Sequence, residues 1–151
     1  MDVIIREGKA ADVPALMALV NELARYEKAP EEVTNTEGQM LEDGFGDNPI
    51  FGSFVAEKKG EIIGLSIYYY RYSTWKGKRM YLEDLVVSEA MRGMGAGKLL
   101  FEATMAHGKK KGCTGMMWQV LEWNKPSIEF YKKYGAKFDE EWLNCHLDFK
   151  P

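Results

Sequence analysis

Apolar residues in the first quarter of the chain follow first strand and then helix spacing. The β-branched run Val3–Arg6 predicts a short strand. An apolar stripe with helical spacing predicts a helix over Asp12–Glu27, with Pro14 in its first turn. The stripe consists of Val13, Leu16, Val20 and Leu23. Thr36 followed by Gln39 fits a capping box, so a second, shorter helix is expected there.

The rest of the chain alternates predicted strands with two further helices. One helix is expected over Gly97–Lys111 and another from a cap at Asn124 to Tyr134. Strands are expected at Phe51–Glu57, Ile62–Tyr72, Arg79–Val87, Met116–Leu121 and Trp142–Phe149. Connections are short and there is no linker or repeat. The order β-α-α-β-β-β-α-β-α-β therefore predicts one α/β (or α+β) domain over residues 1–151.

Composition and charge narrow the classes of function. The 151 residues hold 20 Lys+Arg and 23 Asp+Glu, a net charge of −3, which disfavours binding to nucleic-acid phosphates. No apolar run approaches the roughly 20 residues that cross a bilayer, and the N-terminus resembles no signal peptide, so we expect a cytoplasmic protein without a membrane partner. Cys113 and Cys145, with two histidines, suggest neither a disulfide framework nor a metal site.

A glycine-rich turn, Arg92–Gly97, lies between a predicted strand and a predicted helix. Its sequence RGMGAG allows a sharp turn and directs unpaired N–H groups toward a phosphate at the helix N-terminus. Arg92 and Leu99 exclude a Walker A loop, and Lys98 excludes the dinucleotide fingerprint G-x-G-x-x-G. From the residues alone, the turn is either a phosphate site or only a tight connection.

The turn and several longer stretches resemble one enzyme superfamily. RGMGAG resembles R-x-x-G-x-G, the pyrophosphate-binding signature of the GNAT superfamily of acetyl-CoA-dependent N-acetyltransferases. Four longer stretches resemble the diamine (spermidine/spermine) acetyltransferase subgroup of this superfamily. They are Glu22–Glu27, Leu41–Gly46, Tyr81–Asp84 and Glu122–Tyr131. The resemblance implies a mixed, mostly antiparallel sheet of about six to seven strands, flanked by about four helices and splayed between its fourth and fifth strands. It also implies a homodimer.

Acetyl-CoA is the cosubstrate that this resemblance implies, without a metal. The positions that match the cofactor-binding positions of the family lie at the end of one strand, in the glycine turn and around the last helix. They are Leu85, Val86, Val87, Arg92, Gly93, Met94, Gly95, Ala96, Gly97, Lys98, Asn124, Ser127, Tyr131 and Lys133. Asn124 also suits a helix cap, and Lys133 also suits a solvated helix surface.

Glu83 matches the position of a base that acts through ordered water in the family. An amine with a pKa near 10.4 must lose a proton before it attacks, at a cost of roughly 4 kcal/mol near neutral pH. An ordinary carboxylate is a weak direct base, so a water relay or simple positioning of the ammonium is easier. Asp84 points to the opposite face of a regular strand, and the resemblance implies a bulge that changes this. Glu83 could instead be a solvated strand carboxylate.

Tyr131 matches the residue that protonates the departing thiolate in the family. An unperturbed phenol with a pKa near 10 gives its proton to a thiolate of pKa near 8.5 at a cost of roughly 2 kcal/mol, so hydrogen bonding to sulfur is the main role expected. The residue also shares a helical face with Ile128 and Tyr134, which suits a core aromatic.

The acceptor site is expected to combine carboxylates with aromatic rings, because these groups bind a small cation. The residues are Tyr26, Glu27, Trp75, Glu83 and Asp84. The segment Tyr72–Gly77 resembles the thialysine branch of the subgroup, since Ser73 stands where the polyamine enzymes tend to carry Asp. We therefore expect direct acetylation, in a ternary complex, of a small di- or polyamine or of a lysine-like amino acid. A protein lysine or N-terminal acetyltransferase and a non-catalytic acyl-CoA sensor stay as alternatives.

Overall fold

A computed structural model describes residues 2–149, and two compact units divide the chain into Met1–Gln119 and Val120–Pro151. The first unit contains a five-stranded sheet in the order β1-β2-β3-β4-β5. Its first four strands are antiparallel neighbours, and β5 runs parallel to β4. The strands are β1 Val3–Glu7, β2 Gly52–Lys58, β3 Glu61–Ser73, β4 Gly77–Val87 and β5 Met116–Met117.

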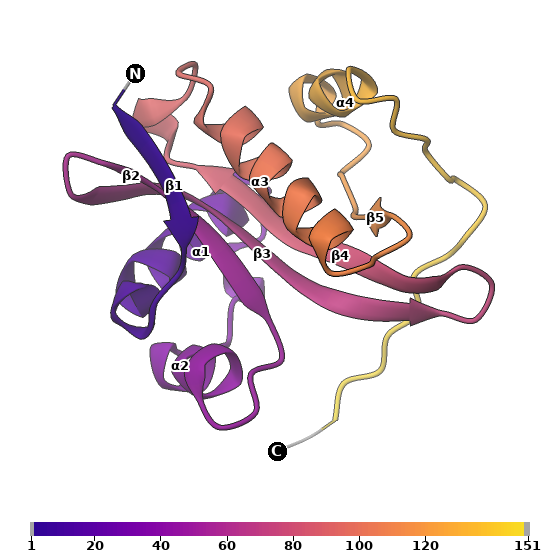
Figure 1. The fold of residues 1–151 in the computed structure, drawn as a ribbon, viewed down its shortest axis with the longest axis horizontal. Coiled ribbons are helices and arrows are strands. Elements are labelled where there is room, and N and C mark those ends of the chain that lie inside the picture. The colour runs from indigo at the N-terminus through magenta and orange to yellow at the C-terminus, as the bar shows by residue number, and fades with distance from the viewer. Residues whose placement is uncertain (1, 150–151) are drawn as a thin grey trace. The chain divides into compact units, whose positions relative to one another are not determined.

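Helices cover both faces of this sheet (Figure 1). One face packs against α1 (Val13–Tyr26) and α2 (Glu37–Phe45), through a core that includes Leu16, Met40 and Val86. The other face packs against α3 (Ala96–Lys110), where Leu100 is fully buried. The amphipathic stripe of α1 and the apolar face of α3 thus form two separate core layers, as their spacing predicts.

Local signals in the sequence account for several helix ends. The Thr36 hydroxyl accepts from Gln39 N at 3.1 Å, which confirms the predicted cap of α2. In the second unit, Asn124 Oδ1 accepts from Ser127 N at 3.3 Å at the start of α4 (Lys125–Lys132). The capping role predicted for Asn124 is therefore confirmed.

One strand prediction is confirmed only in part and another is wrong, and the wrong one leaves five strands in the sheet among the described residues rather than six to seven. Met116–Leu121 pairs with β4 over two residues only. Trp142–Phe149 forms no strand, although its pattern suits one, because no strand of its own unit is present in residues 120–149 to pair with it. Its large apolar side chains are exposed, Phe149 by 91%. A strand needs a hydrogen-bonded neighbour, which an alternating pattern cannot guarantee.

An ion-pair network joins the first strand, the second strand and the start of α1. The Arg6 guanidinium donates to both carboxylate oxygens of Asp12 at 2.9 and 3.1 Å and to Glu57 Oε1 at 3.0 Å. Lys9 N also donates to Asp12, at 2.7 Å. These hydrogen bonds, led by that from Arg6, hold the pKa of Asp12 below its usual value.

We expect Asp12→Asn to lower the free energy of unfolding by about 1–3 kcal/mol at pH 7, because it removes a buried charged acceptor. A carboxylate with a lowered folded pKa stabilises the protein above its unfolded pKa near 4, and this contribution is lost as the pH falls through the folded pKa. Urea unfolding at several pH values measures the difference. The exposed Asp47→Asn is the control, and an equal effect from both substitutions would contradict the network's role.

Candidate functional site

A β-bulge in β4 shapes the centre of the candidate site. Ile67 pairs with Asp84, and the next residue of β3, Tyr68, pairs with Leu82. Glu83 is thus an extra residue that has no partner across the ladder. The bulge implied by the resemblance is confirmed at this position, and it interrupts the regular alternation of side chains.

The bulge brings Glu83 and Asp84 to one face of the sheet. Before it, Met80 contacts Gly108 of α3, so Tyr81 faces away from α3. After it, Val86 packs in the core on the α1 side, and Asp84 shares the face of Val86 by alternation. Tyr81 and Asp84 therefore lie on the same face, with Glu83 between them.

The carboxylates on this face influence one another. Burial raises the pKa of Asp84 to about 6, and the nearby charges of Glu83 and Glu27 add to this effect. Glu27, directly after the last residue of α1, also has a raised pKa because of burial. Three of the five residues predicted for the acceptor site are thus brought together as an acidic cluster, defined here as Glu27, Glu83 and Asp84.

Two stacked tyrosines continue the site along β3 and β4. The rings of Tyr69 and Tyr81 stack with centroids 5.2 Å apart, and the Tyr69 hydroxyl donates to Glu83 Oε1 at 3.2 Å. Burial and the charge of Glu83 raise the pKa of Tyr69 to about 12, so this phenol stays protonated as a donor. The Arg71 guanidinium lies 6.0 Å from the centroid of the Tyr81 ring.

Sequence reasoning missed Tyr69, Tyr81 and Arg71. Alternation along β3 does place Tyr69 and Arg71 on one face. Which face that is, and which residues of β4 lie opposite, depends on the register and on the bulge. The predicted hairpin could have indicated this pair, because Tyr69 and Tyr81 are nearly equidistant from its turn and so are expected to pair across the two strands.

Trp75 lies apart from the acidic cluster within the first unit. It occupies the tip of the β3–β4 hairpin and is 85% exposed. Strand residues from Gly77 to Glu83 separate this tip from the bulge by about 20 Å. The Ser73 hydroxyl accepts from Trp75 N and Lys76 N at 3.2 and 3.0 Å, so it stabilises the turn.

Tyr26 packs against the glycine turn through Arg92. The guanidinium carbon of Arg92 lies 5.1 Å from the centroid of the Tyr26 ring, and Arg92 Nε donates to the carbonyl of Val87 at 3.1 Å. Nearby, Glu89 N donates to Glu22 Oε2 at 2.8 Å. The C-terminal half of α1 is therefore linked to the segment that precedes α3.

The glycine turn has the left-handed backbone that only glycine adopts easily. Gly93 and Gly95 have φ values of +87° and +84°, and Gly95 is the residue before the first turn of α3. The first N–H groups of a helix have no acceptor within the helix, so those of Ala96, Gly97 and Lys98 suit an anion. The predicted cofactor residues Arg92–Lys98 are thus gathered in one turn at the start of α3.

The strand beside this turn offers a free edge. β4 pairs with β5 only at Met80 and Tyr81. From Leu82 to Val87, within the part of the chain that is described, this edge of β4 has no strand neighbour. The backbone of Leu85–Val87 is therefore available on the side that β5 leaves uncovered, as expected for a splayed sheet.

The remaining predicted residues belong to the second unit. Tyr131 is 8% exposed, and the centroid of its ring lies 5.4 Å from that of Phe130. Asn124 is also buried, Ser127 is partly buried, and Lys133 is exposed directly after α4. The buried ring fits the aromatic packing that the helical spacing suggested.

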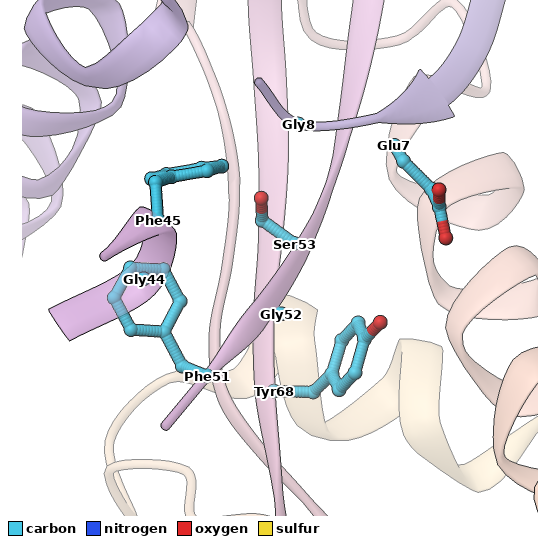
Figure 2. A pocket seen from close by; sticks show the side chains of 8 residues that line it. All are labelled: Glu7, Gly8, Gly44, Phe45, Phe51, Gly52, Ser53 and Tyr68. Atoms are coloured by element: carbon cyan, nitrogen blue, oxygen red, sulfur yellow. The ribbon is translucent and has the colours of Figure 1, made fainter. Parts of the chain in front are cut away.

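A small pocket of about 160 Å³ lies in another part of the first unit and contains none of the predicted site residues. In Figure 2 the rings of Phe45 and Phe51 stand on one side of it, and Tyr68 and Glu7 stand on the other. Among residues 2–149, no group of three or more His, Cys, Asp and Glu side chains is arranged to hold a metal ion. Over the same residues, no helix is both long enough and apolar enough to cross a bilayer.

Comparisons with known proteins agree with this geometry. A sequence profile described as the acetyltransferase (GNAT) family matches residues 14–136. The chain is 38% identical over 143 residues to the thialysine N-epsilon-acetyltransferase of Bos taurus, covering 89% of this chain and 84% of that protein. It is 34% identical over 139 residues to the spermidine/spermine N(1)-acetyltransferase-like protein 1 of Homo sapiens, covering 87% of this chain and 20% of that protein.

Solved structures share the fold at lower identity. An aminoglycoside acetyltransferase, meta-AAC0020, from an uncultured soil metagenomic sample has a TM-score of 0.79 at 19% identity, covering 99% of this chain and 97% of that one. The aminoglycoside N-acetyltransferase AAC(6')-Iy in complex with CoA has a TM-score of 0.76 at 21% identity, covering 96% of this chain and 94% of that one.

The carboxyl of Asp84 is expected to titrate with a midpoint near pH 6 in carboxyl ¹³C NMR, because burial and two neighbouring carboxylates disfavour its charged form. Glu83→Gln should lower this midpoint, since it removes a negative charge. The exposed Glu61→Gln, at the far end of β3, should leave it unchanged. A midpoint near the ordinary value of about 4 would contradict the acidic cluster.

Proposed function

Because the chain belongs to the acetyltransferase (GNAT) family, we propose that it transfers the acetyl group of acetyl-CoA directly to a primary amine of a small di- or polyamine or of a lysine-like amino acid. The observation that carries this proposal is the acidic cluster that the bulge in β4 creates beside a stacked tyrosine pair. Carboxylates and aromatic faces attract an ammonium group. The names of the relatives, a thialysine and a spermidine/spermine-like acetyltransferase, support the same class of acceptor.

Acetyl-CoA supplies the activated acetyl thioester, and the first unit has groups that fit it. The N–H groups of the glycine turn suit the pyrophosphate, and Arg92 and Lys98 add positive charge. The edge of β4 at Leu85–Val87 that faces away from β3 suits the amide groups of the pantetheine and the thioester carbonyl. From the second unit we assign Asn124, Ser127 and Lys133 to the same ligand, on the family resemblance.

Glu83 and Asp84 together are better suited to take a proton than an isolated carboxylate. An ammonium must lose its proton before it attacks, and an ordinary Glu binds that proton weakly. Asp84 has a pKa of about 6, and the two carboxylates share one face of β4. We assign Glu83, which is exposed and accepts from Tyr69, to the water that relays the proton or to positioning of the ammonium.

We assign Tyr131 to the departing thiolate, as hydrogen-bond donor and source of its proton. The assignment rests on the match of Glu122–Tyr131 to the family motif. The family profile runs from residue 14 to residue 136 and so extends over parts of both compact units, which supports a single acetyltransferase domain. A cytoplasmic location and a homodimer stay predictions of the sequence.

Release of free CoA thiol from acetyl-CoA tests the reaction, with spermidine, putrescine, thialysine, lysine and a lysine peptide as acceptors. We expect turnover with small amines above that with the peptide, because the acidic cluster and tyrosine pair suit a small cation. Preference for the peptide would favour a protein acetyltransferase. Binding of acetyl-CoA without turnover on any amine would favour the sensor alternative and overturn the proposal.

Tyr131→Phe is expected to lower turnover roughly 100-fold, a typical contribution of a general acid, and to leave the affinity for acetyl-CoA nearly unchanged. Steady-state kinetics and calorimetric titration with acetyl-CoA measure the two effects. Tyr134→Phe, three residues further along, is the matched control and should keep full turnover. Unchanged turnover in Tyr131→Phe would remove this residue from the mechanism.

Glu83→Gln is expected to lower kcat/KM for the amine roughly 100-fold and to move the acidic limb of the pH–rate profile. The limb moves to lower pH because Asp84 loses a negative neighbour and its pKa falls. The pH dependence of initial rates from about pH 5 to pH 9 measures both effects. A profile identical to that of the unsubstituted enzyme would make Glu83 a solvated carboxylate only.

A further inference from the structure

Arg71 stands on the same sheet face as the acidic cluster, beyond the tyrosine pair. It lies two residues after Tyr69 on β3, and Arg79 is its partner across the ladder. The Arg71 guanidinium lies over the Tyr81 ring. Tyr69 and Tyr81 therefore separate a cation at one end of the site from carboxylates at the other.

The guanidinium has capacity left for an anionic partner. Arg71 Nη1 donates to the thioether sulfur of Met117 at 3.3 Å, which is a weak acceptor. Over residues 2–149 no carboxylate lies within ion-pair distance of Arg71. The side chain is exposed on the β3–β4 hairpin. An arginine fork that faces a binding surface and holds no carboxylate suits bidentate recognition of one.

Both tyrosines respond to the two ends of this charge pattern. Burial raises the pKa of Tyr69 and of Tyr81, the negative charge of Glu83 raises it further, and the positive charge of Arg71 lowers it. The two phenols are thus within electrostatic reach of both groups. A ligand laid across the tyrosine pair would meet carboxylates at one end and a guanidinium at the other.

We propose that Arg71 binds the α-carboxylate of the acceptor, so that the preferred substrate is a lysine-like diamino acid rather than a diamine or polyamine. This inference rests on the proposed function and names the substrate class of the same site. The side-chain ammonium of the substrate lies at the acidic cluster, its methylene chain crosses the tyrosine rings, and its carboxylate meets Arg71.

The dimensions of the site fit such a molecule. The Arg71 guanidinium lies over the Tyr81 ring, and the two residues of strand from Tyr81 to Glu83 span about 7 Å. An extended lysine has six bonds of about 1.5 Å between its side-chain nitrogen and its carboxylate carbon, which also span about 7 Å. A diamine of the same length would bring a second ammonium toward Arg71, and this like-charge contact disfavours it. The guanidinium therefore favours an amino acid by attracting its carboxylate and disfavours a diamine by repelling its second ammonium.

Matched acceptors that differ only in the carboxylate test the proposal. Lysine is compared with cadaverine, and thialysine with bis(2-aminoethyl) sulfide, by CoA thiol release with the unsubstituted enzyme and with Arg71→Gln and Arg71→Lys. We expect Arg71→Gln to lower the ratio of kcat/KM for each amino acid over its diamine by about 10- to 100-fold, the loss of a charge-assisted hydrogen-bond pair. Arg71→Lys, which keeps the charge without the fork, should lower it less.

The control is Lys78→Gln, which removes a cation from the same hairpin on the other sheet face. Lys78 Nζ lies 5.2 Å from the centroid of the Tyr70 ring, and the Tyr70 hydroxyl contacts His107 of α3 at 3.2 Å. This variant should leave the ratio unchanged. Because both rates of a ratio come from one preparation, the folded fraction of a variant does not affect it.

The outcomes distinguish a failure of the role of Arg71 from a failure of the proposed function. A ratio that falls in Arg71→Gln and not in Lys78→Gln supports the inference. Acetylation of amines with a ratio that Arg71→Gln leaves unchanged overturns the inference and leaves the proposed function standing, as does an unsubstituted enzyme that prefers the diamines. An enzyme that acetylates no amine overturns both.

Discussion

The alternation of side chains along a strand is the constraint on which the candidate site depends. In a regular strand, Glu83 and Asp84 would face opposite sides of the sheet, one toward α3 and the other toward α1. The extra residue in β4 removes this separation and brings both carboxylates to the face of Tyr81. The same bulge directs Leu85 and Val87 into the core on the α3 side, next to Leu100. One local irregularity thus creates the acidic cluster while the apolar layers stay intact.

α1 connects the two halves of the proposed reaction site. Its last turns contact the segment before α3 through Glu22 and Tyr26, and Glu27 follows directly and joins the acidic cluster. The glycine turn and the carboxylates are therefore positioned by one rigid helix as well as by β4. A displacement of either group relative to the other would require α1 to leave its buried contacts at Leu16 and Met17.

Local sequence patterns predicted most helices and turns. Features that depend on pairing between distant strands could not be predicted in this way. The stripe of α1, the Thr36 cap, the Asn124 cap and the glycine turn each depend on residues close in sequence, and the structure confirms them. The bulge at Glu83 was predicted only from the family resemblance. Tyr69 and Arg71 were missed because their neighbours belong to another strand. The strand predicted at Trp142–Phe149 is absent. Its alternating pattern shows which residues could share a face, but it does not show whether a neighbouring strand is there to pair with it.

The acidic cluster also explains why the site suits a cation. Burial, together with the charges of Glu83 and Glu27, raises the pKa of Asp84 to about 6, and an ammonium would favour the charged carboxylate by supplying the opposite charge. Arg71 supplies positive charge to this face, but from beyond the tyrosine rings, and it makes no ion pair with the carboxylates. The two charges stay separate because the aromatic pair lies between them and because both belong to rigid strands. A site with fixed, unneutralised charges of opposite sign at its two ends complements a ligand with the reverse arrangement, and a zwitterionic amino acid with a distal ammonium has that arrangement.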